Sequence, residues 1–402
     1  MHTQYSSCPA CGHQIAVPFF DGGEQALATI AWPASEAEAL AMKRLPLKFV
    51  QCVGCDHVYN HAFEYDLVPY TDKPNKMFNL GSIWNEHLSA TQALVLAALP
   101  DNPTVIEIGC GSGQFLRSLA GAKKGRYIGF DPNADIDSAD GLIVARQELF
   151  VPAEHLSALK PDLIIMRHVL EHLKNPLAFL QDIVLHCKLG GLETLFFAEV
   201  PCIDRVFSSL RLADFYFEHH SHFTRLSFQR LLEVSGYKVR TLATGYDEEV
   251  VYALAEILPG GDQRRYAEGA QKFHAGVAQS QQAIGKQLAD FHAAGKRVAI
   301  WGGTGKGAAF IHHYGADKDR FPLVVDSDRG KVGTFVPGAG QEIQFRDVLH
   351  EEKVDIVIIP TQWRAKDIIA EMRPEKIEVL SILIEHEGKL VDFFGASHPY
   401  KK

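Results

Sequence analysis

Short apolar runs alternate with helical patterns through the middle of the chain. Examples are residues 104–108, 127–130 and 162–166, each about one strand long. Runs that are apolar at nearly every position are typical of strands buried on both faces, as in parallel sheets covered by helices. The pattern therefore predicts an α/β unit over residues 76–260.

A second alternating region follows a long helical pattern. Residues 263–294 are rich in Ala and Gln and have helical spacing, which predicts a linking helix. Strands are expected at 297–301, 322–326 and 354–360. The first 75 residues show little periodicity. We therefore expect an α/β protein with a small domain over 1–75, a Rossmann-like domain over 76–260 and a second Rossmann-like domain over 261–402.

The composition is that of a globular protein. The 402 residues are 47% hydrophobic and 22% charged. We see neither an apolar run long enough to span a membrane nor a signal peptide, so we expect a cytoplasmic protein, and we expect a monomer. The net charge of -9 argues against a nucleic-acid partner, although a small anionic substrate remains compatible with it.

Four of the seven cysteines form two CxxC pairs, and about forty residues separate the pairs. In a reducing compartment, paired CxxC units indicate a metal far more often than a disulfide. Four thiolates suit tetrahedral zinc and leave no open coordination position, so we expect a structural ion. Unpaired buried thiols and a redox pair are the alternatives. The expected zinc ligands are Cys8, Cys11, Cys52 and Cys55.

A glycine-rich turn follows the first predicted strand of the middle region. Glycines let the backbone pass close to a ligand. The next strand ends at Asp131, at the spacing where an acid accepts ribose hydroxyls. This spacing also fits a nicotinamide cofactor, and a plain turn is a further alternative. The segment Glu-Ile-Gly-Cys-Gly-Ser-Gly, however, resembles the fingerprint of class I methyltransferases, which implies S-adenosylmethionine as cofactor. The expected cofactor contacts are Glu107, Gly109, Gly111, Gly113, Asp131, Gln147 and His168.

The segment after the fourth predicted strand reads His168-Val-Leu-Glu171-His172, a pattern that some metalloproteases use to bind zinc. Here it follows a strand of a methyltransferase-like sheet, which argues against a protease. We expect His172 to face the reaction cleft, and a surface or core position is the alternative.

The densest polar cluster is the segment 214–223, which contains three histidines, two carboxylates and a tyrosine. Methylation at carbon requires a carbanion equivalent, and a carbon beside a ketone supplies one when a base removes its proton. A histidine can be this base, a carboxylate can orient it and a tyrosine can hydrogen-bond the oxyanion. A second metal site and a polar loop are the alternatives.

Taken together, these motifs resemble the three-domain sugar C-methyltransferases that act on thymidine-diphosphate 4-keto-deoxysugars. The C-terminal part of the resemblance includes Trp301-Gly-Gly-Thr-Gly305-Lys306-Gly307 and Val325-Asp326-Ser327-Asp328. The resemblance implies that His219 is the base and that Tyr216 and Glu218 position it and the substrate. It also implies that His172 and Tyr70 belong to the catalytic set.

The C-terminal glycine turn ends at a predicted helix start, where a diphosphate could bind. We expect Gly305 and Lys306 there, together with His220 of the polar cluster, to bind a nucleotide-linked keto sugar. A dinucleotide site and a purely structural turn are the alternatives.

The predicted reaction is methylation of a carbon beside the 4-keto group, with carbon 3 favoured and carbon 5 possible. The competing hypotheses are a methyltransferase that grips RNA or protein through its zinc domain, a nicotinamide oxidoreductase, and a binding protein without activity.

Overall fold

The computed structural model describes residues 3–30, 32–70, 81–136, 141–372 and 381–401. The chain forms two compact units, Met1–Arg264 and Arg265–Lys402, which are treated separately below. The domain boundary expected near residue 75 lies outside the described residues. No helix in the described part of the chain has the length and apolar character needed to cross a bilayer.

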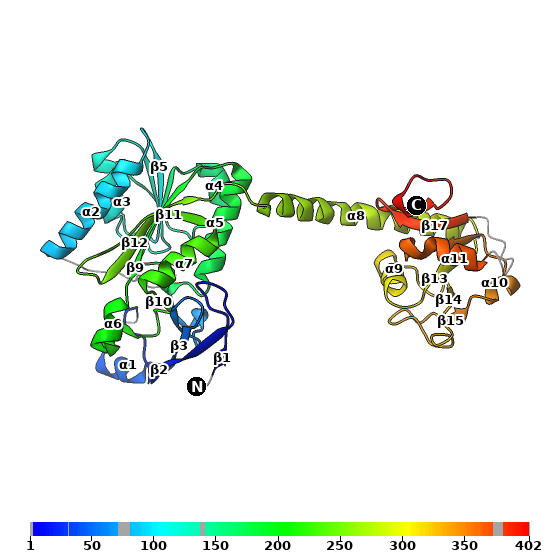
Figure 1. Cartoon of the computed structure of the whole chain (residues 1–402), viewed down its shortest axis with the longest axis horizontal. Coiled ribbons are helices and arrows are strands. Elements are labelled where there is room, and N and C mark those ends of the chain that lie inside the picture. The colour runs from blue at the N-terminus through cyan, green and yellow to red at the C-terminus, as the bar shows by residue number, and fades with distance from the viewer. Residues whose placement is uncertain (1–2, 31, 71–80, 137–140, 373–380, 402) are drawn as a thin grey trace. The chain divides into compact units, whose positions relative to one another are not determined.

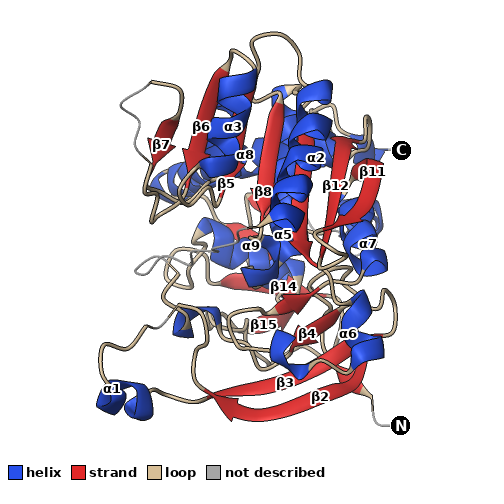
Figure 2. Cartoon of the chain, turned by 90° about the vertical axis from the view of Figure 1, so that its left-hand side faces the viewer, coloured by secondary structure: helices blue, strands red, loops and turns tan. Residues whose placement is uncertain are grey.

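A seven-stranded sheet forms the larger part of unit 1 in its described residues (Figure 2). The strand order is β11-β12-β9-β8-β5-β6-β7. These strands are β5 (Thr104–Ile108), β6 (Arg126–Phe130), β7 (Val144–Arg146), β8 (Leu163–Arg167), β9 (Leu195–Pro201), β11 (Tyr237–Gly245) and β12 (Val250–Ile257).

Five of these strands are parallel, and β11 and β12 pair antiparallel at one edge. The chain moves outward from β5 in one direction to β6 and β7, and later in the other direction from β8 to β9. The strand order therefore reverses between β5 and β8. Open α/β sheets bind ligands beyond the carboxyl ends of their strands at such a reversal, so this fold places a candidate site after β5 and β8.

Helices cover both faces of this sheet, which explains why its strands are apolar throughout. On β5, Ile106 packs with α4, α5 and α7, whereas Val105 packs with α2 and α3. The helices of unit 1 are α1 (Glu36–Ala41), α2 (Ser82–Ala98), α3 (Gln114–Ala122), α4 (Pro152–Leu159), α5 (Pro176–Gly190), α6 (Asp204–Ser209) and α7 (Arg225–Ser235). Short 3-10 turns are η1 (Tyr65–Leu67), η2 (Leu170–His172) and η3 (Leu212–Asp214).

The N-terminal region of unit 1 forms a second sheet, which is antiparallel and has the order β1-β2-β3-β4-β10. Its last strand comes from the segment 214–223, and Ser221 pairs with Tyr59. The N-terminal region and the polar cluster are thus joined by strand pairing. The strands are β1 (Gln4–Tyr5), β2 (Ile15–Gln25), β3 (Leu45–Cys52), β4 (Val58–Asn60) and β10 (Ser221–His222).

Unit 2 contains a six-stranded sheet, of order β15-β14-β13-β16-β17-β18 in its described residues. All neighbours are parallel except β17 and β18. Its strands are β13 (Val298–Trp301), β14 (Leu323–Asp326), β15 (Ile343–Phe345), β16 (Ile356–Ile358), β17 (Ser381–His386) and β18 (Lys389–Asp392). Its helices and 3-10 turns are α8 (Gln263–Ala293), which begins at the unit boundary, α9 (Lys306–Tyr314), α10 (Val348–Glu351), η4 (Gln362–Arg364), α11 (Ala365–Met372) and η5 (Pro399–Lys401).

The long helix α8, drawn in yellow-green in Figure 1, contributes to the core of unit 2 only near its end. Ile284 and Leu288 are its buried residues, and they pack with β13 and α9. Helix α8 confirms the helix expected over residues 263–294. The strands expected at 297–301, 322–326 and 354–360 are confirmed as β13, β14 and β16, and those expected in the middle region as β5, β6 and β8.

Candidate active site

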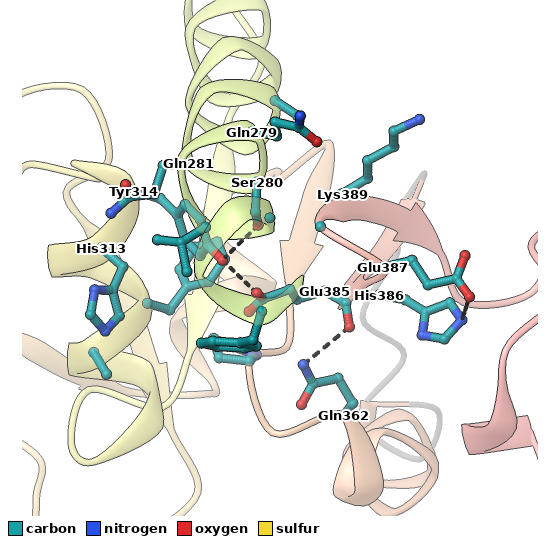
Figure 3. A pocket seen from close by; sticks show the side chains of 18 of the residues that line it. Gln279, Ser280, Gln281, His313, Tyr314, Gln362, Glu385, His386, Glu387 and Lys389 are labelled. Carbon is teal, nitrogen blue, oxygen red and sulfur yellow. Dashed lines mark hydrogen bonds and ion pairs between the residues drawn. The ribbon is translucent and has the colours of Figure 1, made fainter. Parts of the chain in front are cut away.

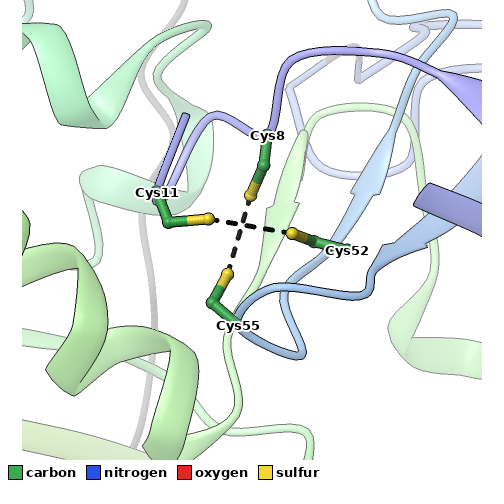
Figure 4. A group of neighbouring side chains, drawn as sticks. All are labelled: Cys8, Cys11, Cys52 and Cys55. Atoms are coloured by element: carbon green, nitrogen blue, oxygen red, sulfur yellow. Dashed lines mark hydrogen bonds between the residues drawn. The ribbon is translucent and has the colours of Figure 1, made fainter. Parts of the chain in front are cut away.

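The four CxxC cysteines meet at one point, as Figure 4 shows. The Sγ atoms of Cys8 and Cys55 are 3.7 Å apart, and so are those of Cys11 and Cys52. A zinc–sulfur distance of 2.3 Å in a regular tetrahedron requires sulfur atoms about 3.8 Å apart. The geometry of the cluster therefore fits a structural zinc ion.

This cluster lies against the methyltransferase-like sheet through helix α5. The amide of Leu177, in the first turn of α5, donates to the carbonyl of Pro9 between the first two cysteines over 3.1 Å. Gly12 has a φ of +76°, and its amide donates to the carbonyl of Cys8. The positive φ explains why a glycine ends this turn. The turn that carries Cys8 and Cys11 is thus hydrogen-bonded to α5, one of the helices that cover the larger sheet.

The glycine-rich turn follows β5, next to the point where the strand order reverses. Gly109, Gly111 and Gly113 have φ values of +72°, +51° and +69°. Such values favour glycine. At Gly109 a Cβ atom would also lie 2.3 Å from the Val169 side chain, so this position needs glycine for space as well. The turn leads into α3 and leaves the backbone open to a ligand.

Asp131, just past the end of β6, holds this turn in place. Its carboxylate accepts the amide of Gly111 over 3.1 Å and the amide of Asn133 over 2.7 Å. Gln147 lies beyond the next strand, and its side chain donates to the carbonyl of Ala134. Both expected cofactor contacts therefore lie just past the carboxyl ends of β6 and β7.

Glu107 points from β5 into the protein and is only 4% exposed. Burial raises the pKa of its carboxyl to about 7, and the nearby Arg167 guanidinium opposes that shift. One carboxylate oxygen lacks a hydrogen-bond partner among the described residues. An unsatisfied buried acceptor at the base of the glycine turn is consistent with a ligand group that completes the site.

A charged network that the sequence did not predict is centred on Glu199 of β9. This carboxylate is fully buried and contacts Arg167 at 3.0 Å, His168 at 2.9 Å and His87 of α2 at 2.6 Å. Its pKa is well below the usual range: burial acts to raise it, but Arg167 and the two histidines outweigh that effect. Burial likewise acts to lower the pKa of His168, yet its contacts with Glu171 and Glu199 raise it to about 9.

Glu199 could have been noticed as a lone acid inside an apolar strand, the same feature that marks Glu107. Its partners could not have been foreseen, because α2, β8 and β9 are distant in sequence. The network lies beside His168, one of the expected cofactor contacts, at the carboxyl end of β8.

The catalytic residues expected from the sequence form a compact group. The hydroxyl of Tyr216 is 2.9 Å from Nε2 of His219, and the rings of His219 and His172 are 4.7 Å apart. Nδ1 of His172 lies 2.9 Å from the carbonyl of Glu218, to which the hydroxyl of Tyr70 also donates over 2.5 Å. Four of the five side chains that we assigned to the catalytic set therefore come together, and Glu218 contributes its backbone carbonyl.

This group adjoins the cofactor loop. Asn133, which is held by Asp131, donates its side-chain amide to the carbonyl of Tyr70 over 2.8 Å. His172 and His168 both follow β8 within a few residues. A ligand on the glycine turn and a substrate at His219 would thus be neighbours.

Burial governs the electrostatics of the group. It lowers the pKa of His219 well below the usual value, and the neighbouring His172, His222 and His168 add to the effect. It raises the pKa of the Tyr70 and Tyr216 hydroxyls. At neutral pH the imidazole of His219 is therefore uncharged and both hydroxyls keep their protons.

The carboxylate of Glu218 differs from our expectation, because its hydrogen bonds do not go to His219. Its Oε1 accepts the amide and hydroxyl of Thr29, over 2.7 Å and 3.2 Å, and the amide of Ile30 over 3.3 Å. The side chain is fully buried. In this structure Glu218 fixes the N-terminal region to the loop that carries His219.

The position of His220 also differs from our expectation that this residue binds the substrate. It is 7% exposed and stacks on Phe63 at 4.7 Å, within the core of the N-terminal region. Burial lowers its pKa to about 4. This position favours a packing role over substrate binding.

The glycine turn of unit 2 follows β13. Gly305 has a φ of +55°, and at Gly307 a Cβ atom would lie 1.8 Å from the carbonyl oxygen of Gly302. Lys306 begins α9, and its Nζ lies 3.9 Å from the centre of the Trp363 ring, a cation–π contact. The turn thus has the close backbone approach and the cation expected from its sequence.

Lys306 also lines a hollow of about 1060 Å³ within unit 2, formed by α8, α9 and the β17–β18 hairpin. Figure 3 shows that Tyr314 and Ser280 point toward one another in this hollow. Tyr314 donates to the carboxylate of Glu385, and the side chain of Gln362 donates to the Glu385 carbonyl over 3.1 Å. Cationic, aromatic and amide side chains thus share one cavity.

Two family models match the chain. A methyltransferase domain matches residues 84–242, and a C-methyltransferase C-terminal domain matches residues 253–385. The first match contains the glycine turn and the His219 group, and the second contains the glycine turn of unit 2.

The chain is similar to the C-methyltransferase NovU of Streptomyces niveus, with 26% identity over 83% of this chain and 84% of that protein. It also matches the nonribosomal peptide synthetase dtxS1 of Metarhizium robertsii, with 28% identity over 29% of this chain, and spans 2% of that synthetase. Among solved structures, a SAM-dependent methyltransferase from Aquifex aeolicus matches with a TM-score of 0.33 and 16% identity, over 43% of this chain and 92% of that one.

Proposed function

Because the chain belongs to the S-adenosylmethionine-dependent C-methyltransferases, we propose that it methylates a nucleotide-linked 4-keto-deoxysugar at a carbon beside the ketone. The observation that carries this proposal is the group of Tyr70, His172, Tyr216 and His219 next to the glycine turn. It combines an uncharged base with hydroxyl donors, the set that enolate formation needs.

His219 is the proposed base. Its ring is half-buried, so a ligand can reach it, and its depressed pKa keeps it unprotonated at neutral pH. A neutral imidazole accepts a proton, whereas an imidazolium cannot. Tyr216, 2.9 Å away, would hold the ring in orientation.

The two tyrosines are the proposed donors to the enolate oxygen, and Tyr70 would exchange its present bond to the carbonyl of Glu218 for one to that oxygen. Burial raises the pKa of both hydroxyls, so each keeps the proton that it would share with an oxyanion. Nδ1 of His172 lies between the hydroxyl of Tyr70 and the carbonyl of Glu218. His172 would thereby hold in place the part of the group that faces the substrate.

Gly109, Gly111, Gly113, Asp131, Gln147, Glu107 and His168 are the proposed cofactor contacts. They share one edge of the sheet, at its point of strand reversal. The cofactor supplies an electrophilic methyl group on a sulfonium. Zinc at the cysteine cluster is proposed to be structural, since four thiolates complete its coordination.

For the substrate we propose a thymidine-diphosphate sugar, with the diphosphate at Gly305 and Lys306 at the start of α9. Carbon 3 is the preferred acceptor and carbon 5 the second candidate, since both flank a 4-keto group. We further propose that the protein acts as a monomer in the cytoplasm.

The test is incubation with labelled adenosylmethionine and a panel of nucleotide 4-keto sugars, followed by mass detection of products. We expect His219→Ala to bind the cofactor normally but to lose methylation and solvent exchange of the substrate's α-hydrogen, each by at least about 100-fold. His186→Ala, on the outside of α5 beside Asp182, is the matched control and should behave as wild type. Unchanged α-hydrogen exchange in His219→Ala would remove His219 as the base.

A further inference from the structure

Glu171 is a buried carboxylate whose place in the active site is unexplained so far. It is 1% exposed, and neither of its oxygens has a hydrogen-bond partner among the described residues. On one side its Oε1 lies 3.6 Å from Nδ1 of His168. On the other side it faces His172 and His219, with polar atoms of the three side chains within 4.8 Å of one another.

A buried carboxylate without hydrogen bonds is costly unless a cation compensates it. His168 is one such cation, but it is already shared with Glu199, which it contacts at the shorter distance of 2.9 Å. A second positive charge next to Glu171 would therefore be stabilised, and the ring nearest to the proposed chemistry is His219.

Each of the other carboxylates near the cluster already has at least one oxygen bound to a protein group. Glu218 accepts from Thr29 and Ile30 through Oε1, and its Oε2 has no partner among the described residues. Glu199 contacts Arg167, His168 and His87. Asp214 is paired with Arg211, at 2.7 Å. Glu171 differs from these carboxylates because neither of its oxygens accepts a hydrogen bond from a described residue.

We propose that Glu171 is the positioning residue for the base, the negative charge that stabilises His219 once it has taken a proton. This inference rests on the function proposed above. In that step the α C–H bond of the keto sugar breaks, its electron pair forms the enolate, and an N–H bond forms on His219. The ring becomes a cation within a few ångström of the anionic Glu171, in a site largely closed to water, where such an attraction is weakly screened.

Several titratable groups face Glu171 or the ring that it supports, and all of them enter the pH dependence of the step. They come from the end of β8, from η2, from the loop before β10 and from the end of the N-terminal region: His168, His172, Asp214, Tyr216, His219, His222 and Tyr70.

The experiment compares Glu171→Gln with wild type in the full-length, zinc-loaded chain. Gln keeps the shape and removes the charge. The measurements are the rate of α-hydrogen exchange of the keto sugar in deuterated water with adenosylhomocysteine bound, kcat and KM for methylation, and the Kd for adenosylhomocysteine. We expect exchange and kcat to fall together by about 100-fold, with KM and Kd changed less than about twofold.

Two further variants separate the base from the cofactor side. Glu199→Gln removes the other carboxylate on His168 and should weaken cofactor binding more than it slows exchange at saturating cofactor. Glu171→Asp keeps the charge one methylene further back and should retain more exchange than Glu171→Gln. If Glu171→Gln does not fold, Glu171→Asp carries the test, with an expected loss of about tenfold in exchange and an unchanged Kd.

Three results would overturn the inference. One is exchange in folded Glu171→Gln, or in Glu171→Asp if that variant carries the test, within about threefold of wild type. Another is a loss that follows the cofactor Kd, since Glu171 would then serve only His168. The third is a second metal ion per chain that Glu171→Gln removes, which would make Glu171, His172 and His219 ligands. If wild type neither exchanges nor methylates any keto sugar, the proposed function fails as well.

Discussion

At the scale of single residues, the motif Tyr216-x-Glu218-His219 shows what a sequence pattern specifies and what it leaves open. Tyr216 and His219 contact one another, as the pattern predicts. Glu218 keeps its place in the motif but uses its carboxylate to hold Thr29 and Ile30. A motif fixes residue types and spacing along the chain, whereas the direction of a buried carboxylate depends on amides that are distant in sequence.

The same limit applies to the charged network. His168 is expected at the cofactor edge because it follows a strand, and in the structure it lies directly after β8. Its partner Glu199 and the second carboxylate at Glu171 were not expected. Each becomes visible only when β8, β9 and η2 are placed side by side.

This network predicts a measurable pH dependence of stability. The pKa of His168 rises to about 9 on folding, because Glu171 and Glu199 outweigh the effect of burial. A group whose pKa is higher in the folded state stabilises it fully below its unfolded value, about 6.5, and loses that effect as the pH rises. We expect the free energy of unfolding of unit 1 to fall by roughly 3 kcal/mol between pH 6.5 and 9.

Urea unfolding across this pH range measures the effect. His168→Asn should flatten the decline, and Asn tolerates the φ of +54° at this position. A wild-type stability that does not change between pH 6.5 and 9 would contradict the contacts described for His168.

At the scale of elements, the parallel strands were the easiest to predict. A strand such as β5 is apolar because helices cover both of its faces, and that pattern is local in the sequence. The strand β10 could not be predicted in this way. It has two residues, and its partner β4 lies more than 150 positions earlier. Pairing over such a distance depends on the assembled fold, not on the local pattern.

Helix α7 follows β10 and predicts a second measurable effect. Thr224 caps it: the Thr224 hydroxyl accepts the amide of Ser227 over 3.0 Å, and the Ser227 hydroxyl accepts the amide of Thr224 over 2.9 Å. Both residues are buried, so water cannot replace the bonds. Thr224→Ala should lower the free energy of unfolding by about 1–2 kcal/mol in urea titrations.

The matched control is Ser35→Ala at the start of α1. Ser35 makes the same kind of cap to Glu38, but α1 is six residues long and has no buried residue. We expect a loss of less than about 0.5 kcal/mol there. Equal losses at both caps would show that burial does not matter to the Thr224 bonds.

At the scale of the whole chain, the cysteine cluster and the group around His219 belong to the same unit, and both are hydrogen-bonded to parts of it that surround the larger sheet. The cysteine turns bond to α5 through Pro9, and the N-terminal region reaches the catalytic loop through Thr29 and Glu218. Loss of zinc should therefore affect methylation, although no cysteine ligand belongs to the catalytic group.

We expect Cys8→Ser, or treatment with a strong chelator, to lower the melting temperature of unit 1 by about 10 °C or more, since each kcal/mol lost shifts a unit of this size by a few degrees. Methylation should fall in parallel. Calorimetry with zinc analysis measures both. Cys187→Ser is the control. This thiol is on α5, buried in the hydrophobic core and outside the cysteine cluster, so the variant should keep one zinc per chain. Full activity in the zinc-free protein would contradict the coupling.

The pairing of β10 with β4 has a practical consequence for protein engineering. A chimera with a relative that exchanges only the cysteine-bearing segment would join four strands from one parent to a fifth from the other. It would also pair the Glu218 carboxylate of one parent with the amides of residues 29 and 30 from the other parent. Breakpoints that transplant residues 1–70 and 203–224 together would keep this sheet of single parentage. Domain shuffling in this enzyme should therefore follow strand partnership and not the linear order of the chain.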